Sequence, residues 1–428
     1  MAWLVASIRA WAQRWLKGWL PDLDPRVWIL AAGRLLSQVG IGFTLFYAPI
    51  FFTAQVGLSA TQVGVGIGLG SVAGMGGRFL GGSMADSPRW GRRPTLLASA
   101  LVSAVADGVL LLANDFSIFL VGNLLMGFGV GLYWPAAESV AADITTPQQR
   151  NEAYALVRLA DNLGLGVGVI AGGLLISLTG AYRALFAIDG ITFLLFFAII
   201  YIAIAETRPA GNGATSLWQG WGQALGDTSL MVYAAVNVLF TAYLAQIQST
   251  LPLYLNRYVG EGQSAGQSVG LSEGTLSLLF TGHVVLAAIA QLPVARWLNR
   301  YRPAQGLMAS ALLWGLGFGL VWQAGTGAAP VVWGSLALGV MALAMVAYTP
   351  IGSALVAALA PEALRGVYLS VNSMCWAVGY LIGPPLGGWA LDQGDAFAHG
   401  FWLGLMATVA PALAVLVWLD RRLRHHRS

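Results

Sequence analysis

Six ionisable side chains lie inside long apolar stretches of this sequence, where they can carry charge or protons. They are Arg34, Asp107, Glu138, Arg158, Asp161 and Asp189. An ionisable group in lipid is costly unless it is paired or hydrated, so each is a functional candidate. A carboxylate in a low-dielectric cavity can exchange a proton near neutral pH. Asp161 is therefore the first candidate for a proton carrier, with Asp107, Glu138 and Arg34 as further proton-coupling candidates.

Permanent ion pairing is the alternative for the same residues. Arg158 and Asp161 are three positions apart and can pair on one helix, and an Arg34–Asp161 pair is equally open. Glu138 and Arg158 lie toward the same ends of neighbouring segments, which favours a gate or structural pair over substrate contact. Asp189 follows Arg183 closely, and we expect it at the membrane interface.

The counts of cysteine, histidine and lysine argue against an enzyme. There is one cysteine, four histidines and a single lysine, Lys17. These counts exclude a disulfide framework, an iron–sulfur cluster and a phosphate-binding loop with its lysine. We expect a protein that is not an enzyme, has no metal or cofactor, and is not driven by ATP. The net charge of +4 comes from short basic clusters, which favour cytoplasmic loops over nucleic-acid binding.

The elements that position these groups are membrane-spanning helices. The chain has 428 residues, of which 57% are hydrophobic and 9% charged, whereas soluble domains carry roughly 25% charge. Apolar runs of about 20 residues match the hydrocarbon thickness of a bilayer. Twelve such spans are predicted, over residues 27–53, 60–84, 94–113, 116–142, 152–178, 183–205, 229–256, 273–298, 303–324, 329–359, 366–391 and 399–420.

Basic residues predict the orientation of these spans. With the N-terminus inside, eighteen basic residues fall on the inner side and only Arg183 and Arg257 on the outer side. The positive-inside rule then places both termini in the cytoplasm. The segment 1–26 has Trp11, Trp15 and Trp19 on one helical face and basic residues opposite, which indicates an interfacial amphipathic helix.

An internal repeat divides the chain. Tyr133-Trp134-Pro135 recurs as Tyr348-Thr349-Pro350, an offset of 215 residues, and Arg150 recurs as Arg365. Two parallel six-helix halves usually enclose a substrate site at their interface. We expect an N-terminal bundle over 27–207, a flexible glycine-rich cytoplasmic linker over 208–227, and a C-terminal bundle with a basic tail over 228–428.

The loop between spans 2 and 3 carries the most specific motif. Gly82 and Asp86 are followed by Gly91, Arg92 and Arg93, which resembles the cytoplasmic loop of the major facilitator superfamily, although the linker here is about two residues longer. The resemblance implies an all-α membrane protein of twelve transmembrane helices in two pseudo-symmetric bundles. It also implies that Asp86 and Arg93 brace the inner gate against the opposite half. The N-terminus of span 11, near Gly366, is the expected partner of Asp86, because a carboxylate is favoured there.

A second motif consists of glycines in span 5 and their copies in span 11. It resembles the signature of the antiporter branch of the family, with Val169 where that branch has proline. Tight helix packing explains the same spacing. The family's span-4 arginine is absent, since Asn123 stands in its place, which counts against the usual proton relay. The motif residues are Gly164, Gly168, Gly172, Gly173, Gly383, Pro384, Gly387 and Gly388.

The expected substrate cavity is aromatic with a few polar groups, which suits amphipathic ligands. The resemblance favours proton-coupled export of hydrophobic or amphipathic small molecules by a monomer in the inner membrane. Uptake of a hydrophilic solute and lipid translocation stay open. His283 is expected to be a packing residue more than a proton carrier. The candidate cavity residues are Arg34, Gln38, Tyr133, Trp134, Asn237, Gln246, Gln248, His283, Tyr348, Asn372 and Trp376.

Overall fold

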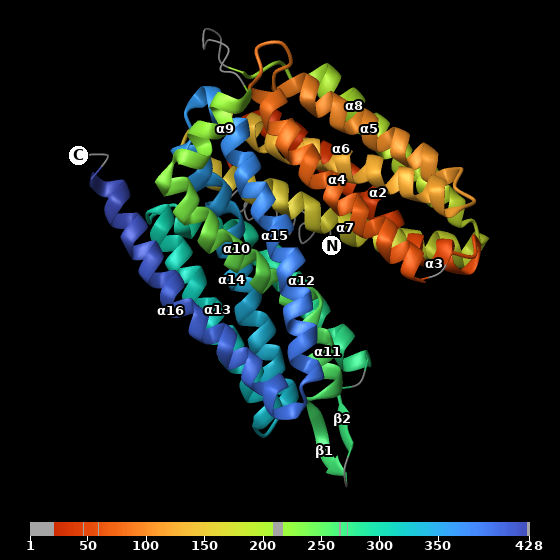
Figure 1. Cartoon of the computed structure of the whole chain (residues 1–428), viewed down its shortest axis with the longest axis vertical. Helices are drawn as coiled ribbons and strands as arrows, with labels where there is room; N and C mark the ends of the chain where they lie inside the picture. The colour runs from red at the N-terminus through yellow and green to blue at the C-terminus, as the bar shows by residue number, and fades with distance from the viewer. Residues whose placement is uncertain are drawn as a thin grey trace, which may run out of the picture.

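The computed structural model describes residues 21–45, 47–58, 60–208, 217–264, 267–271 and 273–425. Most of the predicted amphipathic segment, residues 1–20, lies outside this part of the chain. Within it, long helices account for nearly all of the structure (Figure 1). Those of the first half are α2 (Pro25–Leu45), α3 (Tyr47–Ala54), α4 (Ala60–Asp86), α5 (Arg92–Leu111), α6 (Phe116–Asp143), α7 (Arg150–Thr179) and α8 (Tyr182–Ala203).

The second half repeats this plan. Its elements are α10 (Thr228–Gln248), α11 (Thr250–Arg257), α12 (Glu273–Leu298), α13 (Pro303–Thr326), α14 (Pro330–Leu359), α15 (Arg365–Asp392) and α16 (Asp395–His425), with a 3-10 turn at Glu362–Leu364. The packing is equivalent in the two halves. α6 packs against α4 and α5, as α14 packs against α12 and α13. Likewise α2 packs against α7 and α8, as α10 packs against α15 and α16.

Ten helices in the described part of the chain are long and apolar enough to cross a membrane. Two of the predicted spans, α4 and α15, are less apolar than these ten helices, although they have 27 and 28 residues. Each is therefore longer than the about 20 residues that a bilayer requires. Glycine and serine lower their hydropathy, and these small residues form the contact between the two helices described below.

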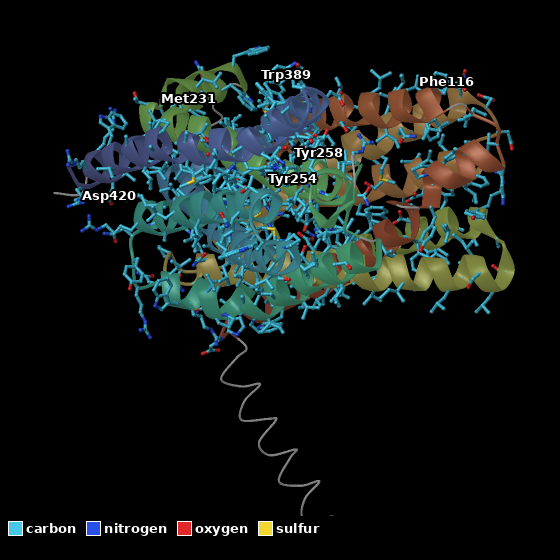
Figure 2. The ribbon with its side chains drawn as sticks, turned by 90° about the horizontal axis from the view of Figure 1, so that it is seen from below. Phe116, Met231, Tyr254, Tyr258, Trp389 and Asp420 are labelled. Atoms are coloured by element: carbon cyan, nitrogen blue, oxygen red, sulfur yellow. The ribbon has the colours of Figure 1, made fainter. Side chains whose placement is uncertain are left out.

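The first span of the second half is interrupted, which the sequence did not indicate. Predicted span 7 is divided into α10 and α11 at Ser249. After α11, strands β1 (Gly260–Ser264) and β2 (Gln267–Gly270) form an antiparallel hairpin. Tyr254 and Tyr258 hold α11 in place (Figure 2), since Tyr258 donates a hydrogen bond to the Leu391 carbonyl at 2.6 Å and Tyr254 packs on Trp402.

The predicted flexible linker is partly ordered, and that prediction was wrong for residues 217–226. They form helix α9 (Leu217–Gly226). Trp221 is buried, stacks on Phe79 of α4 with ring centroids 4.5 Å apart, and donates its indole N–H to Ser83 at 2.9 Å. A tryptophan buries a large apolar area while its N–H still needs a partner, and α4 supplies both.

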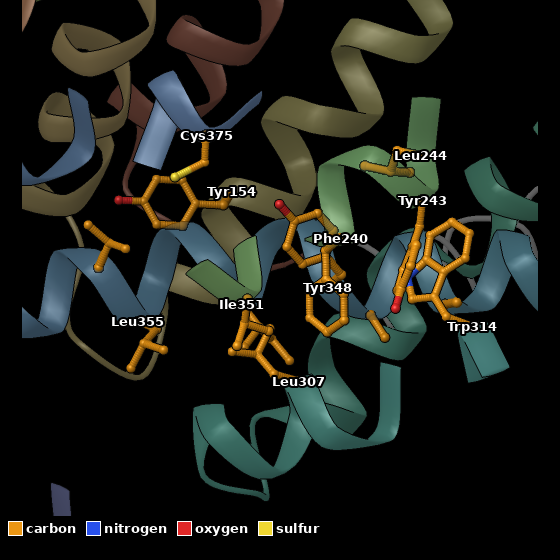
Figure 3. Packing of buried hydrophobic residues seen from close by; sticks show 14 of the residues in the cluster. Tyr154, Phe240, Tyr243, Leu244, Leu307, Trp314, Tyr348, Ile351, Leu355 and Cys375 are labelled. Atoms are coloured by element: carbon orange, nitrogen blue, oxygen red, sulfur yellow. The ribbon is translucent and has the colours of Figure 1, made fainter. Parts of the chain in front are cut away.

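The two halves converge at one end and diverge toward the other (Figure 1). The convergent end, where α4, α6 and α14 finish and α5, α7 and α15 begin, is called the gate end below. A hydrophobic cluster crosses between the halves, since Tyr154 of α7 packs in the same cluster as Tyr348, Ile351 and Leu355 of α14 (Figure 3). At the divergent end, α3 and the β1–β2 hairpin lie far apart (Figure 1).

Candidate functional site

Asp86, the last residue of α4, binds the first turn of α15 across the gate end. Its carboxylate oxygens accept hydrogen bonds from the backbone N–H groups of Gly366 at 2.9 Å and Val367 at 2.8 Å. The first N–H groups of a helix have no partner within it and carry positive partial charge. One carboxylate therefore joins the two halves. Gly82, one turn earlier, makes this approach possible, because a Cβ there would lie 2.0 Å from Ser370 Oγ and 2.5 Å from the Gly366 carbonyl.

Arg92, and not Arg93, is the loop arginine at this junction. The fully buried Arg92 side chain lies 2.5 Å from Asp143 and 3.8 Å from Asp86, and it donates to the Glu362 carbonyl at 3.1 Å. Arg93 instead donates to the Tyr201 carbonyl of its own half at 2.6 Å. The backbone N–H groups of Arg92 and Arg93, in the first turn of α5, both donate to the Glu206 carboxylate. Consecutive residues of a helix point in different directions, so Arg92 faces the junction and Arg93 faces away from it.

A second contact across the gate end lies at the pseudo-symmetric position. Asn151, in the first turn of α7, donates to the Ala295 carbonyl at 2.7 Å and to Asn299 at 3.0 Å at the end of α12. Arg296 pairs with Glu152 at 3.1 Å. The α4–α15 and α12–α7 contacts therefore close the gate end on both sides of the pseudo-two-fold axis.

Four of the predicted charges form one cluster below the gate. Arg34 lies 2.5 Å from Asp161, and Arg158 lies 3.7 Å from Asp161 and 3.3 Å from Glu138. All of these pairings were open from the sequence, and the structure contains each of them. The two positive and two negative charges balance, so none of the four ions is left unpaired between the apolar helices, where an unpaired charge would be strongly destabilising.

Aromatic rings cover this charge cluster. The Arg34 guanidinium lies 4.1 Å from the centroid of the Tyr133 ring and 4.9 Å from that of Trp134. Arg158 lies 4.3 Å from Trp134 and 5.4 Å from Trp376. Cations are attracted to the faces of aromatic rings. Trp376 belongs to α15, so the cluster contacts both halves.

Glu138 also links the halves directly. Ser353 of α14 donates its hydroxyl to Glu138 at 3.0 Å, and the two positions are 215 residues apart. They are thus equivalent positions of the internal repeat, facing each other across the pseudo-symmetry axis. Sequence reasoning did not single out Ser353, although the 215-residue offset applied to Glu138 pointed to it. Arg78, which donates to Ser373 of α15 at 2.8 Å, was likewise missed.

The amide candidates of the second half are held by each other. Asn237 donates to Asn372 at 2.9 Å and accepts a hydrogen bond from Tyr348, and Tyr233 donates to Asn372 at 3.1 Å. Asn372 in turn lies 3.5 Å from Ser353. A buried polar network therefore runs from α10 through α15 and α14 to Glu138, and buried polar groups of this kind must be satisfied.

The remaining cavity candidates are placed differently. Gln246 donates to the Gly383 carbonyl at 2.7 Å, and His283 bonds to the Leu338 carbonyl at 2.9 Å, so both join neighbouring helices of one half. Gln248 is exposed at the end of α10, and Gln38 is half-buried on α2 beside Gly164.

The glycine motif packs helices tightly, with one exception. A Cβ on Gly164 or Gly168 would lie 2.4 or 2.1 Å from carbonyls of α2, and Gly172 and Gly173 face the Tyr47 ring. In the second half Gly379, Gly383 and Gly387 face α10 and the first residue of α11 in the same way, and Pro384 lies within α15. Gly388 has open space around its Cβ position, so it makes no such contact.

Asp189 is buried between helices of the first half and lies apart from Arg183. Its side chain is fully buried on α8 and accepts a hydrogen bond from Thr44 of α2 at 2.9 Å. Asp107 of α5 is also fully buried. Arg183 lies elsewhere, donating to the Leu111 carbonyl and to Asn114. Helix rotation, which spacing in sequence does not reveal, directs Asp189 toward α2.

Two voids bear on the location of the site. One of about 10 Å³, room for no more than a water, adjoins the charge cluster and is lined by Tyr133, Trp134, Glu138 and Arg158. A cavity of about 790 Å³ lies at the gate end of the second half, between Arg302, Leu355, Leu359 and Asp420. None of its lining residues belongs to the charge cluster. We place the candidate site at the cluster because Ser353 and Trp376 of the second half contact it.

Comparisons with known proteins agree with this architecture. The Major Facilitator Superfamily model matches residues 30–269 and 261–428. The multidrug resistance protein MdtH of Photorhabdus laumondii is 26% identical over 380 residues, covering 86% of this chain and 87% of that protein. MdtH of Aeromonas hydrophila is 26% identical over 396 residues, covering 91% and 94%.

Among solved structures, a bacterial homologue of the iron transporter ferroportin in an outward-facing state superposes with a TM-score of 0.75. It is 15% identical and covers 92% of this chain and 99% of that one, a likeness of fold alone. The family match spans nearly the whole described chain, and its two segments cover both six-helix halves. The chain is an integral membrane protein that belongs to the Major Facilitator Superfamily of transporters.

Proposed function

We propose that this transporter exports hydrophobic or amphipathic small molecules across the inner membrane in exchange for protons. Relatives named as multidrug resistance proteins support export. The aromatic groups Tyr133, Trp134 and Trp376 around the charge cluster favour ligands with an apolar body. The amides of Gln246 and Asn372 are already bonded within the second half, which leaves a polar solute fewer partners.

The observation that carries the proposal is the neutral four-charge cluster between the halves. Protonation of Asp161 or Glu138 would leave the cluster with a net positive charge and weaken its hold on Arg34 or Arg158. Because Glu138 also accepts from Ser353 across the interface, such a change alters the contact between the halves. Differential stabilisation of two states by one ligand is what couples its binding to a conformational change.

The gate end faces the cytoplasm in this proposal, since it carries most of the basic loop residues. Both termini then lie in the cytoplasm as well. With this orientation, we assign the structure to the outward-facing state of an alternating-access cycle, with Asp86 and Arg92 in the closed inner gate. We keep Asp161 as the carrier of the exchanged proton, because it contacts both arginines of the cluster.

The test is transport by the purified protein in proteoliposomes. A panel of hydrophobic cations, lipids and sugars is first screened by counterflow, in which bound substrate is exchanged without net proton movement. With a substrate in hand, Asp161→Asn should abolish accumulation driven by a pH gradient and keep counterflow. Asp115→Asn, on an exposed helix cap of the same half, is the matched control.

Three results would redirect the proposal. A full gradient response in the Asp161→Asn variant would refute Asp161 as carrier. Loss of gradient response and counterflow together would identify Asp161 as a structural partner of Arg34. Counterflow of a sugar or another hydrophilic solute, and of no amphipathic compound, would favour uptake over export, whereas lipid exchange would favour lipid translocation.

A further inference from the structure

Two carboxylates in the first half lie outside the charge cluster and have no counter-ion. Asp107 of α5 and Asp189 of α8 are each 0% exposed. Both oxygens of Asp107 and one oxygen of Asp189 have no hydrogen-bond partner in the described part of the chain. The other Asp189 oxygen accepts the Thr44 hydroxyl at 2.9 Å. Three acceptor atoms of the described residues are thus buried without a hydrogen bond, which native proteins rarely tolerate.

The two side chains lie together because α5 and α8 approach closely. A Cβ on Gly190, the neighbour of Asp189, would lie 3.3 Å from the Asp107 Cβ. From the third side, α2 presents Gly40, where a Cβ would lie 2.4 Å from the free Asp189 oxygen and 2.1 Å from Thr192 Oγ. Because Gly40 has no side chain, the Asp189 carboxyl and the Thr192 hydroxyl fit between the three packed helices.

The charged groups on the helices that pack against α5 and α8 are engaged elsewhere. Arg34 on α2 pairs with Asp161, Arg78 on α4 with Ser373, and Glu138 on α6 with Arg158. At the gate end, Arg92 lies between Asp86 of α4 and Asp143 of α6, and Arg93 lies nearby. Arg26 on α2 pairs with Asp24. Arg183 on α8 donates to backbone carbonyls and Asn114. No described cation is therefore available to neutralise Asp107 and Asp189.

We propose that Asp107 and Asp189 share a bound proton and form a second protonation site, inside the first half and separate from the charge cluster. Two ionised carboxylates cannot share a buried site without a cation, so one of them retains a proton. The protonated carboxyl then becomes a hydrogen-bond donor, and its neutral form avoids the cost of burying a second uncompensated negative charge. The site does not depend on the proposed proton exchange, because a buried acid pair needs its proton whether or not transport is coupled to it.

The direct test is infrared spectroscopy of the purified full-length protein in lipid nanodiscs, which detects the C=O stretch of protonated carboxyl groups. The wild type should retain an acid band at neutral pH, and Asp107→Asn and Asp189→Asn should each remove or shift it. Asp115→Asn, exposed in the same half, should leave the band unchanged. The infrared measurement requires no transported substrate. A negative result in the proton-coupled transport assay would therefore leave the assignment of the acid band to Asp107 and Asp189 unaffected.

Two further measurements keep the proposal falsifiable if the asparagine variants fold poorly. Thr44→Val removes the hydroxyl that bonds to Asp189 and should shift the acid band while the helices remain intact. Replacing N-methylglucamine by sodium at constant ionic strength should leave the wild-type band unchanged. Loss of the band on adding sodium would overturn the assignment, because it would show that the pair binds sodium in place of the proton. Absence of any acid band at neutral pH would also overturn it.

Discussion

Gly82→Ala is predicted to open the gate end. The added methyl group would lie 2.0 Å from Ser370 Oγ and 2.5 Å from the Gly366 carbonyl oxygen. The serine side chain can rotate away, but the carbonyl belongs to the backbone of α15 and cannot. The two helices must therefore separate, and the hydrogen bonds from Gly366 and Val367 to Asp86 lengthen with them.

The magnitude follows from these two effects. Overpacking of a close contact costs about 1–3 kcal/mol, and a weakened hydrogen bond to a charged acceptor adds up to about 1.5–3 kcal/mol. Separation of α4 from α15 relieves this contact, so the cost falls on the gate-closed state and shifts the conformational equilibrium. The overpacking contribution alone, about 1–3 kcal/mol, changes the ratio of the two states by roughly 5- to 150-fold, and any weakening of the hydrogen bonds increases this change.

Distances between spin labels at the gate ends of α4 and α15 measure this ratio. Gly82→Ala should move the distribution to longer distances, with a complementary shortening between α3 and α11. Gly76→Ala is the matched control, because it lies on the same helix and a Cβ there meets nothing within 4 Å. Distances in Gly82→Ala that equal those of the wild type would refute the steric argument.

Three further predictions concern the same interface and cluster. Asp86→Asn supplies one acceptor for two backbone N–H groups and should shift the label distances in the same direction by about 1–2 kcal/mol; an unchanged distribution would contradict it. Ser353→Ala removes the donor to Glu138 and should lower the stability of the gate-closed state by about 1.5–3 kcal/mol in a thermal-unfolding assay. Ser335→Ala is the control, because it loses only a hydrogen bond to Val331 on the exposed face of α14. It should have little effect in the same assay. Trp134→Ala should weaken substrate affinity tenfold to a hundredfold, since apolar contact with one aromatic ring contributes about 1–3 kcal/mol; normal calorimetric affinity would exclude Trp134 from the site.

Part of the gate could be predicted before the structure. The resemblance of the loop to a family motif implied that Asp86 braces the gate, and the preference of a carboxylate for a helix N-terminus pointed to Gly366 as its partner, as the structure shows. Which arginine completes the junction was not predictable, because Arg92 and Arg93 are adjacent and one helical step decides which faces inward. The order in α9 was also missed, since the glycines of the linker suggested flexibility while Trp221 found a partner on α4.

The sequence by itself determined the helical spans, their division into two equivalent halves and the set of intramembrane charges. These are local properties, because the bilayer sets the length and polarity of each span without reference to its neighbours. Only the tertiary structure decided how those charges combine, with Asp161 and Glu138 neutralised by arginines and Asp107 and Asp189 left beside each other. The physical reason is that helix rotation is set by packing between segments far apart in the chain, so that glycines such as Gly40 and Gly190 determine which carboxylate meets which partner.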